Sequence, residues 1–391
     1  MNAPHVHHDP HPDSPRLSHC PETLPRDGYV SPDWFATEMR TIFARNWIMV
    51  GRLMDLPSGT MRALQIGEAP VLLARASDGG LSAFHNTCRH RGSELCREGE
   101  DRELGKLITC PYHAWSYAAS DGRLVSTGYA HPTQDFRKQD HGLRPIAHHV
   151  WNGFIFLNLS SEPGPLASNS SLATLDNWPA AELITGHHWE SEIGSNWKAF
   201  WENFSECLHC PGIHPELSAL VPVYGTGVSS AKDAWDWTPE QPAPAARLRE
   251  GAESWTASGA PCGPVFPGLT DEERERGATF VVFWPTAYVV AHVDYIRAVR
   301  LEPLSPTRMK LVAEWYFSAE TLAQPGFDAA SVAAFAKLVM EQDGAASEMN
   351  QRGIASPAFK RGRLMPEEHS IHRFHEWVMR EMDRSTPEAL S

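Results

Sequence analysis

Two short clusters of metal-binding residues constrain this chain more than any other feature of its sequence. The first cluster pairs Cys88 with His90, and the second pairs Cys110 with His113. Each cluster offers one thiolate and one imidazole, which are ligands for zinc and for iron–sulfur clusters. The two turns together supply two sulfur and two nitrogen ligands, so the chain is expected to fold around a metal centre.

Two kinds of centre use this ligand set. A structural zinc ion binds two Cys and two His, but its ligands commonly come in like pairs along the sequence. In a Rieske [2Fe–2S] centre, one iron binds two Cys and the other binds two His. The mixed turns suit two irons that each take one ligand from each turn, and the residues flanking His90 and His113 also argue against zinc. The sequence therefore favours a [2Fe–2S] centre, which passes single electrons to a second site.

Length and composition narrow the possible classes of protein. The 391 residues are enough for two domains, and the net charge of −14 argues against nucleic-acid binding. The longest apolar stretch, residues 279–293, is broken by Pro285 and is too short to cross a bilayer, so no membrane association is predicted. The sequence has no Gly-x-Gly-x-x-Gly motif, so it does not indicate a bound flavin or nicotinamide.

Seven cysteines are present, and two of them are assigned to the cluster. The other five show no disulfide framework. Cys207 and Cys210 form a Cys-x-x-Cys motif without a thioredoxin-like context, so they are interpreted as packing residues. This cysteine usage predicts a reducing, cytoplasmic location.

The predicted elements of the first half form an all-β module. A helix at residues 32–46, capped by Ser31, follows an N-terminal tail. Short strand patterns separated by Gly and Asp turns come next. They lie at residues 47–53, 61–66, 71–76, 81–86, 106–109 and 151–159. A stretch rich in Ser and Pro at residues 160–171 marks a domain boundary.

The second half mixes helices with long antiparallel strands, so the overall fold class is predicted to be α+β. Helices are expected at residues 196–209, 329–352 and 370–384, and strands at 280–290, 294–303 and 309–318. The segment 223–277, rich in Gly, Pro and charge, is expected to form loops over a pocket. The predicted domains are a tail and helix at 1–45, an all-β domain at 46–165 and a second domain at 166–391.

A second metal site is indicated at the end of the helix predicted at residues 196–209. His209 and His214 are five residues apart, so they would not share a face of a regular helix. Pro211 and Gly212 between them are expected to break the helix and to let His214 turn back toward His209. Two imidazoles and one carboxylate form the ligand triad of non-haem Fe(II) oxygenases, which leaves open positions for O2.

The carboxylate of this triad must come from elsewhere in the chain. Asp343, on the helix predicted at 329–352, is the best candidate, and Glu341 and Glu348 compete with it. Spacing alone leaves the three open, because acidic residues on such a helix are commonly solvated.

These motifs resemble the alpha subunits of Rieske non-haem iron oxygenases, over nearly the whole chain beyond the tail. Within that family they resemble the group that demethylates quaternary ammonium compounds such as glycine betaine and stachydrine. The resemblance is carried by residues 196–198, 206–215, 350–353 and 362–366, besides the two Cys/His turns. It implies an N-terminal all-β Rieske domain and a C-terminal catalytic domain with a helix-grip-like antiparallel sheet. The segment between His90 and Cys110 is longer than the family's usual one and is interpreted as a charged loop insertion.

The resemblance also implies roles for individual residues. It selects His209, His214 and Asp343 as the ligands of the mononuclear Fe(II). It places Glu206 where the family has a carboxylate that bridges a Rieske His of the neighbouring subunit to an iron-ligand His. Many members have Asp at this position, so the longer Glu side chain changes the geometry of the bridge. The subunits would form a homotrimer, because the family joins the cluster of one subunit to the iron of the next.

The implied reaction is hydroxylation of an N-methyl group by O2. The resulting hemiaminal releases formaldehyde, and the second oxygen atom becomes water. Electrons from NAD(P)H would arrive through a separate flavin/iron–sulfur reductase. Two alternatives remain, namely oxidation of an aromatic or other small organic substrate, and a Rieske electron carrier without catalysis.

A quaternary ammonium group has no hydrogen to donate, so its binding site is expected to use aromatic faces. Five aromatic residues near the predicted pocket strands are candidates. They are Trp235, Trp237, Trp284, Tyr288 and Tyr295. The chain has 14 Trp, most of which would be core residues, so composition alone does not single out any one of the five.

Overall fold

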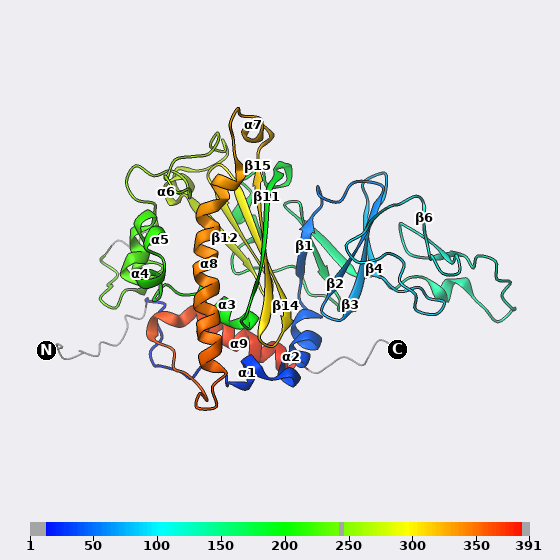
Figure 1. The fold of residues 1–391 in the computed structure, drawn as a ribbon, viewed down its shortest axis with the longest axis horizontal. Coiled ribbons are helices and arrows are strands. Elements are labelled where there is room, and N and C mark those ends of the chain that lie inside the picture. The colour runs from blue at the N-terminus through cyan, green and yellow to red at the C-terminus, as the bar shows by residue number, and fades with distance from the viewer. Residues whose placement is uncertain (1–12, 242–245, 385–391) are drawn as a thin grey trace. The chain divides into compact units, whose positions relative to one another are not determined.

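The computed structural model describes residues 13–241 and 246–384, which form two compact units (Figure 1). The smaller unit comprises Met39–Ser168 and Phe283–Thr286. The larger unit comprises the described residues before Met39, together with Asn169–Val282 and the described residues from Ala287 onward. The residues before Met39 thus pack with the C-terminal half. The domain boundaries given from the sequence stay predictions.

The smaller unit is built from three sheets of short strands. The strands are β1 (Ile48–Arg52), β2 (Thr60–Ile66), β3 (Ala69–Arg75), β4 (Leu81–His85), β5 (Asp101–Glu103), β6 (Leu107–Thr109), β7 (Ser116–Ala118), β8 (Leu124–Ser126), β9 (Ala147–Trp151) and β10 (Phe154–Asn158). The strand orders are β4-β3-β2-β5, β6-β7-β8 and β1-β10-β9. In β2, Met61 and Ala63 are buried, while Arg62 between them forms an ion pair with Asp101. Such alternation is what a sheet with one covered face requires.

The larger unit is organised around one five-stranded sheet. Its strands are β11 (Ile184–Ile193), β12 (Ala278–Phe283), β13 (Ala287–His292), β14 (Ile296–Ser305) and β15 (Arg308–Phe317). They lie in the order β11-β15-β14-β13-β12. The single strand predicted at residues 280–290 was wrong, because a turn at Trp284–Thr286 separates β12 from β13. Pro285 explains the break, since proline cannot donate to a strand ladder.

The larger unit also contains helices, of which α8 and α3 pack against strands of this sheet. The helices are α1 (Asp27–Val30), α2 (Pro32–Glu38), α3 (Trp197–Phe204), α4 (Cys210–Ile213), α5 (Pro215–Leu220), α6 (Asp271–Arg276), α7 (Ala319–Leu322), α8 (Ala329–Ile354) and α9 (His369–Asp383). The long helix α8 crosses the sheet, and α3 packs against both α8 and β14 (Figure 1). None of the described helices is both long and apolar enough to cross a membrane.

The helix predicted at residues 32–46 is present, but only its first half is α-helical. The hydroxyl of Ser31 accepts a hydrogen bond from the backbone N–H of Trp34 at 3.3 Å, which confirms the predicted cap. The helix α2 ends at Glu38, and a π-helical turn follows over Met39–Phe43.

A buried ion pair joins α2 to α3 inside the larger unit. The carboxylate of Glu38 accepts hydrogen bonds from Nζ of Lys198 at 2.5 Å and from Nε1 of Trp197 at 2.9 Å and Trp34 at 3.0 Å. Neither Glu38 nor Lys198 is exposed. Three donors around one carboxylate compensate for its burial. They also fix the position of α3, whose end leads to the candidate iron ligands.

Candidate metal centres and active site

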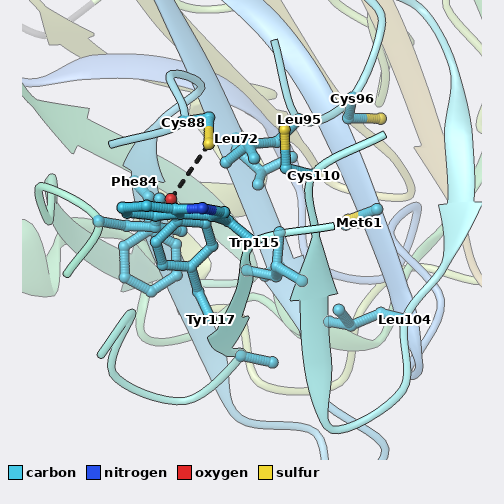
Figure 2. Close-up of a cluster of buried hydrophobic side chains, with 14 of the residues drawn as sticks. Met61, Leu72, Phe84, Cys88, Leu95, Cys96, Leu104, Cys110, Trp115 and Tyr117 are labelled. Carbon is cyan, nitrogen blue, oxygen red and sulfur yellow. Dashed lines mark hydrogen bonds between the residues drawn. The ribbon is translucent and has the colours of Figure 1, made fainter. Parts of the chain in front are cut away.

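The two Cys/His turns come together at one end of the smaller unit. The first turn follows β4, and the second lies between β6 and β7. Cys88 and Cys110 are buried in the hydrophobic core of the unit (Figure 2), whereas His90 is exposed and His113 is half-buried. The two imidazole rings are 4.7 Å apart between centroids.

The separation of the ligand types fits a two-iron cluster. The thiols of Cys88 and Cys110 lie close enough to interact, and burial together with this neighbour raises the pKa of the Cys88 thiol. The two sulfurs thus form a buried side and the two imidazoles an outer side. One iron can take both Cys and the other both His, as a Rieske centre requires. The outer imidazoles would give such a cluster an electron path to the surface.

Polar and aromatic groups hold the two turns. The backbone N–H of Arg89 donates to the hydroxyl oxygen of Tyr117 at 3.0 Å, which leaves the hydroxyl hydrogen free to point at Sγ of Cys88, 3.1 Å away (Figure 2). The ring of Trp115 stacks on His90 at 4.8 Å. Gly128, at a φ of 64°, passes so close that a Cβ there would lie 2.4 Å from the carbonyl oxygen of His113.

The larger unit brings His209, His214 and Asp343 together. His209 lies in the turn after α3, His214 at the junction of α4 and α5, and Asp343 on α8. One possible ligand atom from each side chain lies within 4.8 Å of the other two. Oδ1 of Asp343 is 2.8 Å from Nε2 of His214 and 3.6 Å from Nε2 of His209. Two imidazole nitrogens facing one carboxylate oxygen fit the donor set of a mononuclear Fe(II).

Two neighbouring side chains orient these imidazoles. Nδ1 of His209 donates to Oε1 of Glu206 at 2.5 Å, and Nδ1 of His214 donates to Oε1 of Gln342 at 2.8 Å. These bonds turn both Nε2 atoms toward Asp343, as outer partners of metal-binding His residues commonly do. Burial lowers the pKa of His209, but hydrogen bonds to Asp343 and Glu206 outweigh it and raise that pKa to about 9.

The other two acidic candidates on α8 have different contacts. Oε1 of Glu348 accepts a hydrogen bond from the backbone N–H of Gly194 at 2.9 Å, which ties α8 to the end of β11. The carboxylate of Glu341 is half exposed and lies 3.6 Å from Nζ of Lys337. The structure therefore brings Asp343, and neither glutamate, to the two imidazoles.

The local path of the chain around His209 differs from the prediction. The helix α3 ends at Phe204, because the carboxylate of Glu206 accepts hydrogen bonds from the backbone N–H groups of Leu208 and His209. Pro211 does not break a longer helix. It lies in the first turn of α4, where its missing N–H has no partner to lose.

The interpretation of Cys207 and Cys210 as packing residues was wrong. Both are buried, but the structure joins them by a disulfide across the turn before α4. Their Cα atoms are 4.9 Å apart, well within the range that a disulfide spans. The turn brings the pair together although the sequence shows no disulfide framework.

The five predicted substrate residues occupy different surroundings. Tyr288 is buried, and its ring centroid lies 4.4 Å from that of Phe204 at the end of α3. Tyr295 is buried in the connection between β13 and β14, and its hydroxyl donates to the carbonyl oxygen of Trp255 at 2.7 Å. Trp235 is 64% exposed. Trp237 is buried beneath Lys232, and Trp284 belongs to the smaller unit.

A cavity of about 320 Å³ adjoins Glu206 on the larger unit. Glu202 and Glu368 also line it, and burial together with the nearby carboxylates raises the pKa of Glu368. Residues Gly362, Arg363 and Leu364, from one of the stretches that carry the family resemblance, form part of its wall. The cavity thus presents an acidic lining beside the group that holds His209.

Sequence reasoning missed two residues of these sites, Tyr117 and Gln342, although both lie close in the sequence to the motifs that they support. Gln342 was visible only as the neighbour of Asp343, and no spacing rule connects it to His214. Their roles depend on tertiary packing, which no local pattern reports.

Two family models match the chain. The model for the ring hydroxylating alpha subunit (catalytic domain) matches residues 180–384, and that for the Rieske [2Fe-2S] domain matches residues 46–137. The first match covers more than half of the chain. The chain therefore belongs to the ring-hydroxylating oxygenase family, as an alpha subunit with its own Rieske domain. This confirms the predicted fold class and cofactors, a [2Fe–2S] cluster and a mononuclear iron.

Individual relatives narrow the group further. The glycine betaine monooxygenase oxygenase subunit of Chromohalobacter salexigens is 32% identical, over 87% of this chain and 81% of its own length. The chloroplastic choline monooxygenase of Spinacia oleracea is 28% identical, over 93% of this chain and 78% of its own length. The crystal structure of the quaternary ammonium Rieske monooxygenase CntA matches with a TM-score of 0.68. It covers 94% of this chain and 97% of that one at 21% identity, so it shows the fold alone.

Proposed function

We propose that this chain is the oxygenase component that hydroxylates an N-methyl group of a small quaternary ammonium compound. One atom of O2 is inserted into a C–H bond of the methyl group. The other atom is reduced to water by two electrons and takes up two protons. The hemiaminal then breaks its C–N bond to give formaldehyde and the demethylated amine. The convergence of His209, His214 and Asp343 in a relative of quaternary ammonium monooxygenases carries this proposal.

Residues of the larger unit have three proposed roles at the iron site: binding the metal, orienting its ligands and contacting the substrate. His209, His214 and Asp343 would hold the mononuclear iron, which when bound activates O2 with electrons from the cluster. Glu206 and Gln342 hold the two imidazoles in the orientation that leaves Nε2 of each for the metal. Tyr288 would offer an aromatic face to the methylammonium group, with Trp235, Trp237, Trp284 and Tyr295 as further candidates.

The residues of the smaller unit would supply the electrons. Cys88 and Cys110 would bind one iron of the cluster, and His90 and His113 the other. NAD(P)H would be oxidised by a separate flavin/iron–sulfur reductase, which reduces the cluster one electron at a time. Because NAD(P)H is a cytoplasmic reductant, the proposal places the enzyme in the cytoplasm.

The assembly would be a homotrimer in which the cluster of one subunit serves the iron of the next. The acidic cavity beside Glu206 supports this, because it could receive His113 of a second copy. Mixing a Cys110→Ala chain with a His209→Ala chain tests the arrangement. Mixed trimers should recover part of the activity, since some interfaces pair an intact cluster with an intact iron site. A fully active monomer would contradict it.

Formaldehyde release tests the function directly. The iron-loaded chain, supplied with a compatible reductase, NAD(P)H and O2, is incubated with a panel of N-methylated amines and of aromatic compounds. We expect formaldehyde from quaternary ammonium compounds and about three irons per chain. Hydroxylated aromatic products without formaldehyde would favour the alternative substrate class. Two irons per chain and no product from any compound would favour an electron carrier.

A further inference from the structure

The disulfide of the larger unit encloses a candidate iron ligand. Cys207 and Cys210 are joined across a turn, with only Leu208 and His209 between them. Sγ of Cys210 lies 4.0 Å from Nε2 of His209, the nitrogen that would bind the iron. Hydroxylation of an N-methyl group uses neither sulfur, so the proposed function leaves this pair without a role.

The turn is held together by bonds other than the disulfide. The backbone N–H of Cys210 donates to the carbonyl oxygen of Cys207 at 3.0 Å, and the N–H of His214 donates to the carbonyl oxygen of Cys210 at 2.9 Å. The carboxylate of Glu206 accepts the backbone N–H of His209 at 3.4 Å. A disulfide across so short a loop adds little stability, because its effect on the unfolded chain grows with loop length. The two cysteines would therefore stay adjacent in the reduced protein, ready to close again.

The compartment also argues against a purely structural role for this disulfide. The proposed function places the enzyme in the cytoplasm, where thiols are kept reduced and a disulfide is usually transient, either catalytic or redox-sensing. The five other cysteines of the chain, all within the described residues, are free thiols. Oxidation at this one pair therefore indicates a site of thiol redox chemistry.

The two cysteines have different surroundings. Cys210 is 3% exposed and adjoins the iron site, whereas Cys207 lines a second cavity, of about 120 Å³, together with His369. The chain between them lies at the surface of the larger unit, since Leu208 is 43% exposed. A small oxidant formed at the iron site can thus meet Cys210 first, and a reductant from solvent can approach the disulfide at the turn and through the cavity beside Cys207.

We propose that Cys210 and Cys207 form a redox pair that reduces hydrogen peroxide released at the iron site. The inference rests on the proposed function, because O2 that takes up two electrons and two protons without oxidising the substrate leaves as H2O2. The thiol sulfur of Cys210 bonds to one oxygen of H2O2, and the O–O bond breaks. The thiol proton leaves with the other oxygen as water, so Cys210 becomes a sulfenic acid.

The sulfenic acid of Cys210 then reacts with the thiol of Cys207. The S–S bond forms, the S–O bond breaks, and the OH group leaves as water with the proton of the Cys207 thiol. Two thiols thus lose two electrons, and one H2O2 becomes two waters. A cytoplasmic dithiol reopens the disulfide by exchange and is itself oxidised to a disulfide. The structure shows the oxidised state of a cycle that removes peroxide beside the iron ligands.

The test follows the thiols of the full chain with both metals bound. The enzyme is reduced with dithiothreitol, freed of it without air, and given reductase, NAD(P)H, O2 and a poorly hydroxylated amine, with catalase in solution. Differential alkylation and mass spectrometry then map each cysteine. The Cys207–Cys210 disulfide should form at least about 10-fold faster than Cys20 is oxidised, because catalase spares this exposed cysteine while peroxide formed at the iron meets Cys210 first.

Two variants sharpen the test. Cys207→Ser should stop at a sulfenic acid of Cys210, which dimedone labels, because no second thiol is left to displace the OH group. It should keep the initial rate of formaldehyde release, since the backbone bonds of the turn remain. Cys20→Ser is the matched control, because it removes a free cysteine far from the turn along the chain, and it should behave as the wild type.

Two results with the wild type alone would overturn the inference. A disulfide that dithiothreitol leaves intact in the folded enzyme would be structural, and a pair that stays reduced during this turnover would meet no peroxide. If the wild type consumes no O2 and releases formaldehyde from no amine, the proposed function fails, and H2O2 added to the reduced enzyme decides the inference. Closure of the Cys207–Cys210 disulfide supports a peroxide-reducing pair, and oxidation of Cys20 alone overturns it.

Discussion

The two candidate metal centres draw their ligands from the chain in different ways. All four ligands of the cluster lie within residues 88–113, on two turns that belong to one small β module. The iron site combines His209 and His214 with Asp343, which lies on a different helix far along the sequence. The first site therefore depends on local turn geometry. The second depends on how α3 and α4 pack against α8.

The difference extends to the groups that support each site. Around the cluster, Tyr117 lies on β7, the strand that follows the second turn, and Trp115 directly precedes that strand. Around the iron site, α3 is held in place by a buried ion pair between its own Lys198 and Glu38. Glu38 lies on α2, near the N-terminus of the chain. A centre assembled from distant segments should be the more sensitive to changes in packing, and the two centres should respond independently to loss of their own ligands.

The largest expected effect is the loss of an iron ligand. Asp343→Ala should abolish turnover and reduce the iron content from about three to about two per chain, while the visible spectrum of the cluster stays unchanged. The carboxylate of Asp343 faces both imidazoles, whereas those of Glu341 and Glu348 contact Lys337 and the backbone of Gly194 instead. Iron analysis and the absorption spectrum measure the two centres separately.

Glu348→Ala is the matched control, because it removes a carboxylate from the same helix that bonds the backbone of Gly194 instead. We expect it to keep all its iron. If Glu348→Ala loses the third iron and Asp343→Ala keeps it, the assignment of the carboxylate is wrong.

The cluster site was predicted from the sequence more completely than the iron site, because all of its ligands lie close together along the chain. The Cys/His spacing within residues 88–113 contains every candidate ligand of the cluster, so no tertiary information was needed to propose them. The pair His209 and His214 was visible, but the choice among Glu341, Asp343 and Glu348 depended on a family resemblance. Only packing shows that Glu348 bonds Gly194 and that Glu341 faces solvent beside Lys337.

The errors in secondary structure have a similar physical origin. The apolar spacing at residues 196–209 predicts a helix throughout, but the carboxylate of Glu206 bonds backbone groups of the next turn and ends the helix at Phe204. The apolar run at 280–290 predicts one strand, but Pro285 lies within it and a turn results. Side-chain competition for backbone hydrogen bonds is not visible in apolar periodicity.

The iron site should depend on packing at residues far from its ligands. Lys198→Met leaves the buried carboxylate of Glu38 without its cationic partner, so it should reduce the free energy of unfolding by about 3–5 kcal/mol. The mononuclear iron should be lost more readily, since α3 leads to its ligands, whereas the absorbance of the cluster should be retained. Urea unfolding followed by Trp fluorescence and by cluster absorbance measures the two responses.

A double variant serves as the control. Lys198→Met combined with Glu38→Gln removes both charges, so much of the stability should return. A stability of Lys198→Met within about 1 kcal/mol of the wild type would show that the ion pair does not support the site.

A smaller effect is expected where the two centres are coupled. Glu206→Gln should keep both metals but slow turnover by about 10–100-fold, because the amide holds His209 less strongly and would weaken the proposed bridge to the cluster of a neighbouring subunit. Stopped-flow absorbance should show a reduced cluster that persists with substrate and O2 present. Glu202→Gln is the control, since Glu202 lines the same cavity but bonds Tyr29 and His375. Fast reoxidation of the cluster in Glu206→Gln would remove Glu206 from the electron path.

The smallest effect is expected at the cluster itself, whose support is local. Tyr117→Phe removes the hydroxyl that points at Sγ of Cys88 and that accepts the backbone N–H of Arg89. A hydrogen bond to a cluster sulfur stabilises the reduced, more negative form, so its loss should lower the reduction potential by roughly 30–60 mV. Redox titration followed by electron paramagnetic resonance measures the shift. The iron content and the stability of the larger unit should not change. An unchanged potential would mean that the hydroxyl serves only to fix the turn at Arg89, and a loss of the mononuclear iron would show that the two centres are less independent than their ligand sources indicate.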